Sequence, residues 1–382
     1  MNNSTDISNP DFDYLFLKLE NNKKNMLYSP LSIRYGLNML KKGAKGNTYD
    51  EINKLIGNTE LPKYKSIDKY LSLANGIFIR DMYYEYVKQS YINTLKEKYD
   101  AEIIQDEFKD AQNANKWIEN KTLGIIKKML KDEIVQNSEM IIINALAIDM
   151  EWYYHFDCDE TYGGTFYLDD GQEMKATMMS NDEIKSNYIS YYIDDDITVL
   201  TMSLKNYNGT QLEFMAIMPD KNLNTFIENV SKEQITQIDK KLKLSSDEKD
   251  GVNIIIPKFK FNYDLKLKGD LMNLGINDAF NYTADFSKMT EEELYVSEAL
   301  HKADIEFSED GIKAAAVTVF AMGDLDGPPD EEEKHPINII IDKPFMFVIR
   351  DRETKDIWFT GTVYKPNSWE NDKKKYEPID DY

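Results

Sequence analysis

One apolar run, residues 140–148, limits the folds open to this chain more than any other stretch. It is the longest apolar run in the sequence, rich in β-branched side chains, and it shows no alternation of apolar and polar positions. A strand with one face in water alternates, whereas a strand covered on both faces does not. The run therefore predicts a central strand that is buried on both faces. A chain of 382 residues is long enough to build the layers that would cover it.

The order of the remaining patterns predicts an α+β fold. Helical spacing dominates before residue 130, with one helix expected to begin at Pro30 and to end at Gly43. Strand patterns dominate after residue 140, for example over residues 212–218 and over 252–261, where Pro257 is expected near a strand edge or bend. Helices followed by strands are typical of the α+β class. We find no internal repeat, so we expect one domain over residues 1–382 with a polar, charged tail at 367–382.

Charge and cysteine content exclude several classes of protein. The formal net charge of -22 argues against a surface for nucleic acid or anionic membrane, because phosphate binding needs Lys and Arg. Cys158 is the only cysteine, which excludes an internal disulfide and a cysteine-based metal cluster. Residues 1–28 contain no apolar signal-peptide core. We therefore expect a cytoplasmic protein, or one secreted without a recognisable signal peptide.

Few residues in the sequence suit catalysis. The three histidines, His155, His301 and His335, have no zinc-ligand spacing, and neither a Gly-x-Ser-x-Gly motif nor a phosphate-binding loop occurs. Cys158 lies close to His155, but catalytic Cys–His pairs are rarely neighbours in sequence. We expect no enzyme activity, no catalytic residue, no metal site and no cofactor.

A late segment, residues 309–318, is unusual because a glycine is followed by small side chains. Small side chains bury little apolar area, so such a segment gains little from one fixed position. As a strand it would place Ile312, Ala314, Ala316 and Thr318 on one face and Lys313 on the other. An alanine-rich helical turn is the alternative, since Ala is the best helix former. Composition alone does not decide between the two.

Short motifs along nearly the whole chain resemble those of the serpin family. Each motif is weak alone, but their order and spacing are specific; they lie at residues 28–33, 43–48, 115–118, 143–145, 152, 178–179, 217–219, 256–259, 274–276, 301–303, 309–318, 343–345 and 359–361. The resemblance implies three β-sheets, a shell of about eight or nine helices, and an exposed reactive loop over about residues 309–336.

The resemblance also implies roles for particular residues. The loop would have its hinge at Glu309, Gly311, Ile312, Ala314, Ala315, Ala316 and Thr318. A buried polar cluster, the shutter, would consist of Ser29, Ser32, Asn144 and His301, paired with one another where two central strands part. A second place, the breach, would contain Lys258 and Trp152. There Lys258 would pair with Glu309 and hold the entry point of the loop closed.

The function implied is suicide inhibition by a monomer. A serine protease cleaves the loop and becomes trapped as a covalent acyl complex when the hinge inserts as a new strand. Inhibitory serpins usually carry a small hydroxyl residue at the position of Ile312 and an acidic one at Lys313, so the chain departs from the family there. A non-inhibitory serpin that binds a partner or serves a structural role is the alternative. The small hinge residues favour the inhibitor.

The reactive bond is predicted at Leu325-Asp326, by counting from Glu309 along the usual hinge length of the family. Leu325 suits a chymotrypsin-like or cathepsin G-like protease, as would the rival bond at Met322. The other rival, Asp324-Leu325, suits an Asp-specific cysteine protease of the caspase type. Mass spectrometry after chymotrypsin cleavage tests this. A new N-terminus at Asp326 is expected, and one at residue 323 or 325 would overturn the assignment.

Overall fold

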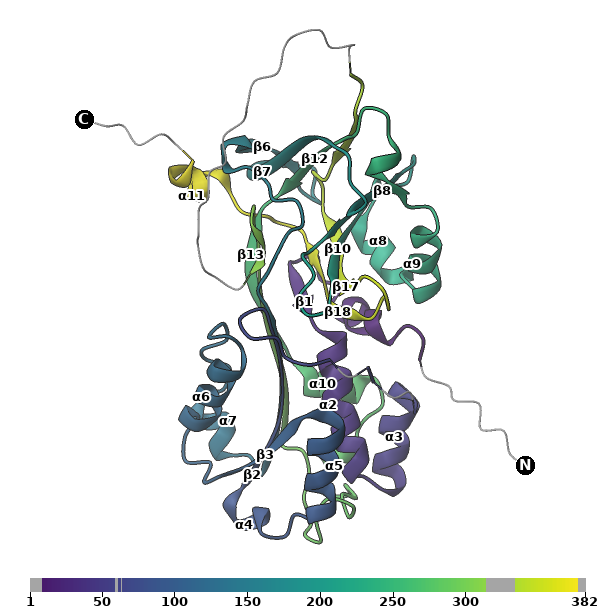
Figure 1. Ribbon diagram of the computed structural model, residues 1–382. Helices are drawn as coiled ribbons and strands as arrows, with labels where there is room; N and C mark the ends of the chain where they lie inside the picture. Colours follow the sequence, from purple (N-terminus) through teal and green to yellow (C-terminus); the bar gives the residue numbers. More distant parts are fainter. Residues whose placement is uncertain (1–8, 59–60, 63, 314–333, 377–382) are drawn as a thin grey trace, which may run out of the picture.

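The computed structural model describes residues 9–58, 61–62, 64–313 and 334–376 of the chain. These residues form three β-sheets with helices packed around them (Figure 1). The α+β fold with three sheets and a helical shell, expected from the sequence, is confirmed.

The central sheet contains the strand predicted from the apolar run. Its order is β3-β2-β4-β14, with β13 on the far side of β14 and two short strands, β15 and β5, completing its upper end. The bounds are β2 Leu71–Arg80, β3 Ala101–Asp106, β4 Met140–Ile148, β5 Met150–Glu151, β13 Phe259–Leu265, β14 Glu298–Phe307 and β15 Gly311–Lys313.

Both faces of β4 are covered, as its lack of alternation predicts. On one face Ile141 and Ile143 pack in an apolar cluster with Ile118 of helix α6 (Gln112–Lys121). On the other face Ile142 packs into the main core, to which Ile33 of helix α2 (Pro30–Gly43) also belongs. Figure 1 shows α6 and α7 on one side of the sheet and α2, α3 and α10 on the other.

The two central strands β4 and β14 pair along only part of their length. They are parallel, and residues 141–143 pair with 298–300 at their lower ends. Among the described residues no pairing joins 144–148 of β4 to 301–305 of β14. Higher up, β15 lies between β14 and β5 and pairs with both of them in the antiparallel sense. At their lower ends β4 and β14 are therefore neighbours. Higher up, β15 separates β14 from β5, the strand that follows β4.

Two smaller sheets form the upper half of the molecule. The first has the order β1-β18-β17-β10-β9-β8-β11 and the second the order β16-β12-β7-β6. Their bounds are β1 Met26–Tyr28, β6 Thr161–Tyr167, β7 Glu173–Ile184, β8 Ile189–Ile193, β9 Ile197–Ser203, β10 Leu212–Pro219, β11 Lys243–Leu244, β12 Val252–Pro257, β16 Ile337–Ile340, β17 Phe345–Asp351 and β18 Ile357–Val363.

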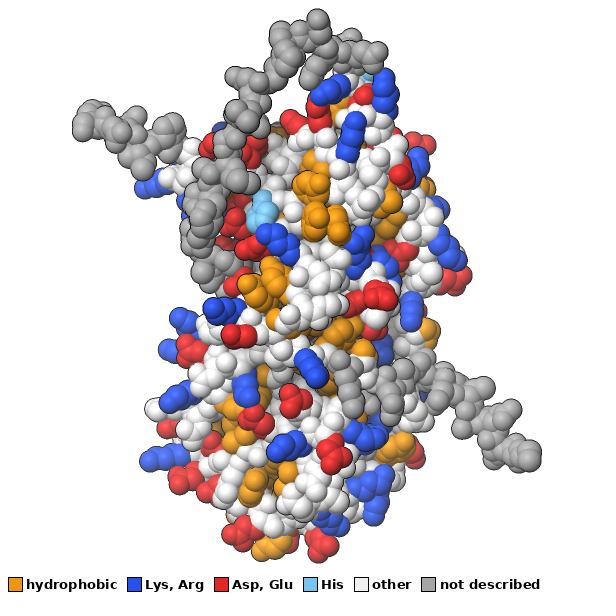
Figure 2. Space-filling model, in the orientation of Figure 1, with side chains coloured by type: hydrophobic (Ala, Val, Ile, Leu, Met, Phe, Trp, Pro, Cys, Tyr) orange, Lys and Arg blue, Asp and Glu red, His pale blue; other side chains and the backbone are white. Residues whose placement is uncertain are grey.

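The helices pack around these sheets. Besides α2 and α6, they are α1 Leu15–Leu19, α3 Gly46–Ile56, α4 Asp81–Tyr84, α5 Gln89–Tyr99, α7 Asp132–Gln136, α8 Leu223–Asn229, α9 Lys232–Asp239, α10 Leu267–Asn273 and α11 Trp369–Asp372. Helix α2 begins at Pro30 and ends at Gly43, the bounds expected from the sequence. Figure 2 shows acidic and basic side chains interspersed over the lower half of one face of the molecule.

At Pro257, where a strand edge or bend is expected, β12 ends, and the chain enters a different sheet as β13 at Phe259. One expectation from the sequence needs correction. The exposed loop does not begin at Glu309. Glu309 and Ile312 are buried, and Gly311–Lys313 is already a strand of the central sheet.

Gly361 in the middle of β18 provides a test of the packing. An added Cβ there would lie 2.0 Å from the backbone oxygen of Met26 in the paired strand β1. Gly361→Ala should therefore destabilise the protein by about 1–3 kcal/mol, because a strand must shift. Urea unfolding measures this, with Gly269→Ala in α10 as the control, since a Cβ at Gly269 meets no atom within 4 Å. Equal unfolding midpoints for the two variants would contradict the packing described.

Candidate functional site

The site begins at the turn that joins β14 to β15. The Ser308 backbone N–H donates to the Gly311 oxygen at 3.0 Å, which closes the turn. Two N–H groups after β5 hold it from outside: Trp152 donates to the Asp310 oxygen at 2.9 Å, and Phe156 donates to the Glu309 oxygen at 3.0 Å. The turn is therefore fixed by backbone contacts on both of its sides.

Gly311 and Ile312 place the start of the hinge inside the sheet. A Cβ on Gly311 would lie 2.2 Å from the Met150 oxygen, so the close approach of β15 to β5 requires glycine. Ile312 pairs with Phe307 on one side and with Met150 on the other, and its exposed fraction is 1%. Complete burial of an Ile side chain contributes about 1.5–3 kcal/mol to the stability of this arrangement.

A buried ion pair lies directly at the turn, in the breach. The Lys258 Nζ lies 2.6 Å from Glu309 Oε2, and the exposed fractions of the two side chains are 7% and 6%. Burial alone would raise the pKa of Glu309, but the charge of Lys258 and the hydrogen bonds from Lys258 and Tyr376 outweigh it and lower that pKa overall. Glu309 is therefore a carboxylate at neutral pH.

Trp152 packs against the turn and the end of β14 from the side of β5. Its indole Nε1 donates to the Ser308 oxygen at 2.8 Å, and its ring packs edge-on against Phe307 at a centroid distance of 5.1 Å. From the resemblance we expect this ion pair to hold the entry point of the loop closed. In the structure the pair is formed while Gly311–Lys313 is already seated, so it does not exclude these residues from the sheet.

The shutter residues lie together but pair differently from the expectation. His301 Nε2 accepts the backbone N–H of Ser29 at 2.9 Å, and Ser29 Oγ caps helix α2 by accepting the Ser32 N–H at 3.0 Å. The Asn144 Nδ2 donates to the side-chain oxygen of Asn75 on β2. The four side chains therefore form no closed network with one another: those of His301 and Ser29 pair with backbone, and that of Asn144 pairs with Asn75.

Among the described residues, two polar atoms of the shutter have no hydrogen-bond partner. They are Ser32 Oγ and Asn144 Oδ1, and both are buried. A cavity of about 30 Å³ lies among Ser32, Asn144 and His301 and is otherwise lined by apolar side chains and Gly36. Buried oxygens without partners cost free energy, so the shutter has acceptor capacity that another donor would satisfy.

Sequence reasoning missed two residues of the site. Asn75 carried a signal, since it is a polar residue inside the apolar strand β2. Tyr376 carried none, because it lies in the charged tail that we expected to be loose. The remaining predicted residues, Ala314, Ala315, Ala316 and Thr318 of the hinge and Met322, Asp324, Leu325 and Asp326 around the reactive bond, lie outside the described residues.

A family model described as serpin (serine protease inhibitor) matches residues 14–366. The chain belongs to the serpin family. An uncharacterized serpin-like protein from Methanosarcina mazei is 30% identical over 371 residues, which cover 91% of this chain and 83% of that protein. Neuroserpin from Gallus gallus is 25% identical over 394 residues, which cover 96% of this chain and 92% of that serpin.

A solved structure of human thyroxine-binding globulin has a TM-score of 0.77 and is 26% identical, with 94% of this chain and 98% of that chain covered. That protein is in complex with thyroxine, so the shared fold does not by itself assign protease inhibition. Among the described residues, no group of His, Cys, Asp or Glu has the arrangement of a metal site. None of the helices in the described part of the chain is long and apolar enough to cross a membrane.

Burial of His301 predicts that the stability of the fold depends on pH. Burial lowers the pKa of His301 from 6.5 to about 4, so the imidazole is neutral in the fold, while it titrates near 6.5 in the unfolded chain. The stability gained from the neutral form is therefore complete above pH 6.5 and is lost as pH falls toward 4. Between pH 7 and pH 5 the loss should be about 2 kcal/mol.

Chemical unfolding of the wild type and of His301→Gln at pH 7 and pH 5 measures this contribution to the free energy of unfolding. The decrease in that free energy between pH 7 and pH 5 should be about 2 kcal/mol smaller in His301→Gln, because glutamine does not titrate. His335→Gln is the matched control, since His335 is exposed, and should retain the full pH dependence. Equal pH dependence in all three proteins would show that His301 is not buried in its neutral form.

Proposed function

We propose that this serpin is a suicide inhibitor of a serine protease that acts by loop cleavage and strand insertion. The observation that carries the proposal is β15, a strand of hinge residues seated between β14 and β5 directly above an unpaired interval of the two central strands. A hinge in this position needs only to lengthen its strand. It does not have to open a closed sheet.

The register of β15 determines where the next residues would lie. Ile312 faces Phe307 and Met150, so continuation of the same antiparallel register would place residues 314–318 opposite 305–301 on one side and 148–144 on the other. This is the interval over which, among the described residues, β4 and β14 have no partner on their facing edges. The five residues 314–318 therefore match the open interval in length.

The side chains of the hinge also suit that interval. Ala314, Ala316 and Thr318 would lie on the same face as Ile312, toward the core, and none of them is charged. Thr318 would lie opposite both His301 and Asn144. Its hydroxyl would supply a donor to the shutter, in which Asn144 Oδ1 and Ser32 Oγ lack partners. The shutter would thus be completed by the inserted strand.

Insertion is favourable because it pairs exposed backbone. Five residues paired on both sides add about ten backbone hydrogen bonds, each worth about 1 kcal/mol net. A sum on the order of 10 kcal/mol is comparable to the whole stability of an ordinary domain. Release of this energy after cleavage would drag a covalently attached protease away from its bound position. We infer that the inhibitor acts as a monomer. We infer that its target is a chymotrypsin-like or cathepsin G-like protease, because Leu325 stands at the predicted reactive bond.

Substitutions at Ile312 test this proposal. Ile312→Arg would bring a charge into a buried position at a cost of several kcal/mol, so insertion should fail. Ile312→Thr should retain insertion, because Thr is smaller and uncharged. Each protein is incubated with chymotrypsin, and complexes that survive denaturing electrophoresis are counted.

The wild type and Ile312→Thr should form such complexes, and Ile312→Arg should be cleaved without forming one. Equal amounts of complex from Ile312→Arg would contradict the mechanism. Clean cleavage of the wild type by a panel of serine proteases, without any complex, would favour a non-inhibitory serpin instead.

A further inference from the structure

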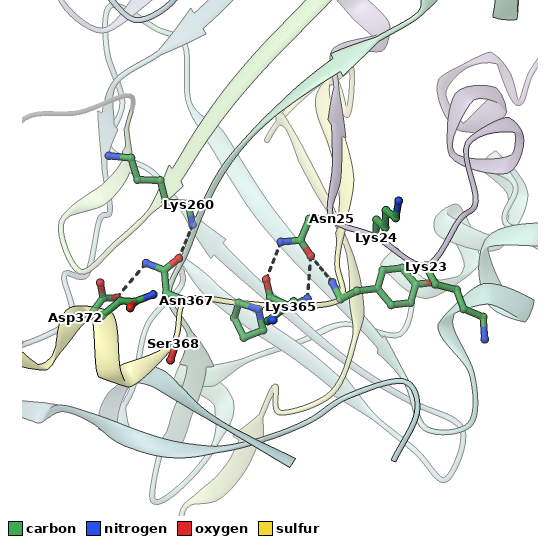
Figure 3. Close-up of a pocket in the computed structure, with 11 residues that line it drawn as sticks. Lys23, Lys24, Asn25, Lys260, Lys365, Asn367, Ser368 and Asp372 are labelled. Atoms are coloured by element: carbon green, nitrogen blue, oxygen red, sulfur yellow. Dashed lines mark hydrogen bonds between the residues drawn. The ribbon is translucent and has the colours of Figure 1, made fainter. Parts of the chain in front are cut away.

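The chain folds back over the breach after residue 366, where the family match ends. The backbone of Asn367 binds near the point where the chain passes from β12 to β13. Its N–H donates to the Lys258 oxygen at 2.9 Å, and its oxygen accepts the Thr177 N–H at 3.1 Å. The Asn367 side chain accepts the Lys260 N–H at 3.0 Å and donates to Asp372 at 3.0 Å (Figure 3). The segment 367–376 is therefore anchored at its beginning.

The end of this segment reaches the ion pair at the turn. Tyr376 Oη donates to Glu309 Oε1 at 2.6 Å and accepts from Lys258 Nζ at 2.7 Å. Because Lys258 also donates to Glu309 Oε2, the three side chains close a ring of hydrogen bonds in which both carboxylate oxygens are used. The Tyr376 ring stacks on Trp369 of α11 at a centroid distance of 5.6 Å and an angle of 17°.

Tyr376 must be protonated to donate a hydrogen bond to Glu309. Burial, and then the hydrogen bond to the Glu309 carboxylate, raise the pKa of Tyr376 above its ordinary value. The phenol therefore retains its proton at neutral pH and serves as a donor. Thr161 Oγ1 adds a longer contact of 3.3 Å to Oε1 of Glu309, so Tyr376 and Lys258 are the closest partners of the Glu309 carboxylate among the described side chains.

We propose that residues 367–376 form a clamp in which Tyr376 positions the turn at 308–310 and so keeps β15 seated in the central sheet. Strand β15 is three residues long and makes few ladder hydrogen bonds of its own. Glu309 lies only two residues before Gly311, so the contacts that fix its carboxylate also fix the start of the strand. Tyr376 acts through Glu309 and is a positioning residue.

One consequence rests on the proposed function. If the loop inserts after cleavage, the seated strand is the nucleus from which pairing extends. A loosened β15 would delay insertion, so a larger share of the protease would complete hydrolysis and escape.

The test uses the intact, full-length protein. Tyr376→Phe removes the hydroxyl but retains the ring and its stack on Trp369. Tyr282→Phe is the matched control, because Tyr282 is 88% exposed and lies far from the turn in sequence. Hydrogen exchange is followed by mass spectrometry in a peptide that covers residues 308–313 and in one that covers β10.

Exchange over 308–313 should be about tenfold faster in Tyr376→Phe, the effect of one lost hydrogen bond to a charged group, and unchanged over β10. Tyr282→Phe should match the wild type in both peptides. Unchanged exchange over 308–313, or an equal rise in both peptides, would overturn the clamp.

The melting temperature of loop-cleaved wild type separates the two proposals. If cleavage does not raise the melting temperature and no protease complex forms, the inhibitory function is refuted. The hydrogen-exchange result then still decides whether the clamp exists. A rise on cleavage with unchanged exchange in Tyr376→Phe would refute the clamp alone.

Discussion

The structure depends on an incomplete pairing between its two central strands. Strands β4 and β14 share a ladder only at their lower ends. Over residues 144–148 and 301–305 each has a partner on its outer side but, among the described residues, none on the side facing the other. Backbone groups in a sheet are costly to leave without partners, so this interval raises the free energy of the fold.

Polar residues mark the two ends of this open interval. At its lower end His301 and Asn144 face the core from opposite strands, and buried oxygens there lack partners. At its upper end the buried pair of Lys258 and Glu309 fixes the turn from which β15 starts. A buried ion pair adds little net stability compared with apolar packing, but it is geometrically specific. The two groups therefore lie where the central strands separate and where β15 starts.

The sequence predicted the parts of the fold that depend on local patterns. Non-alternating apolar side chains identified β4, and Pro30 and Gly43 identified the ends of α2. Pro257 marked a strand edge or bend within the run 252–261, but the change of sheet at that point depends on tertiary contacts and leaves no local pattern. The seating of Ile312 was missed for a related reason. A segment of small residues has similar local preferences in a loop and in a strand, so the partner strands decide its state. The position of Tyr376 depends wholly on contacts with distant residues and leaves no pattern in the tail.

The central claim is that the open interval is filled by the hinge once the loop is cut. Hydrogen exchange over residues 144–148 and 301–305 tests it most directly, before and after complete cleavage of the loop by chymotrypsin. Amides on the facing edges have no ladder partner before cleavage and would gain one from the inserted strand. The account predicts that their exchange slows by at least about an order of magnitude after cleavage. Unchanged exchange in both segments of a fully cleaved protein would contradict it.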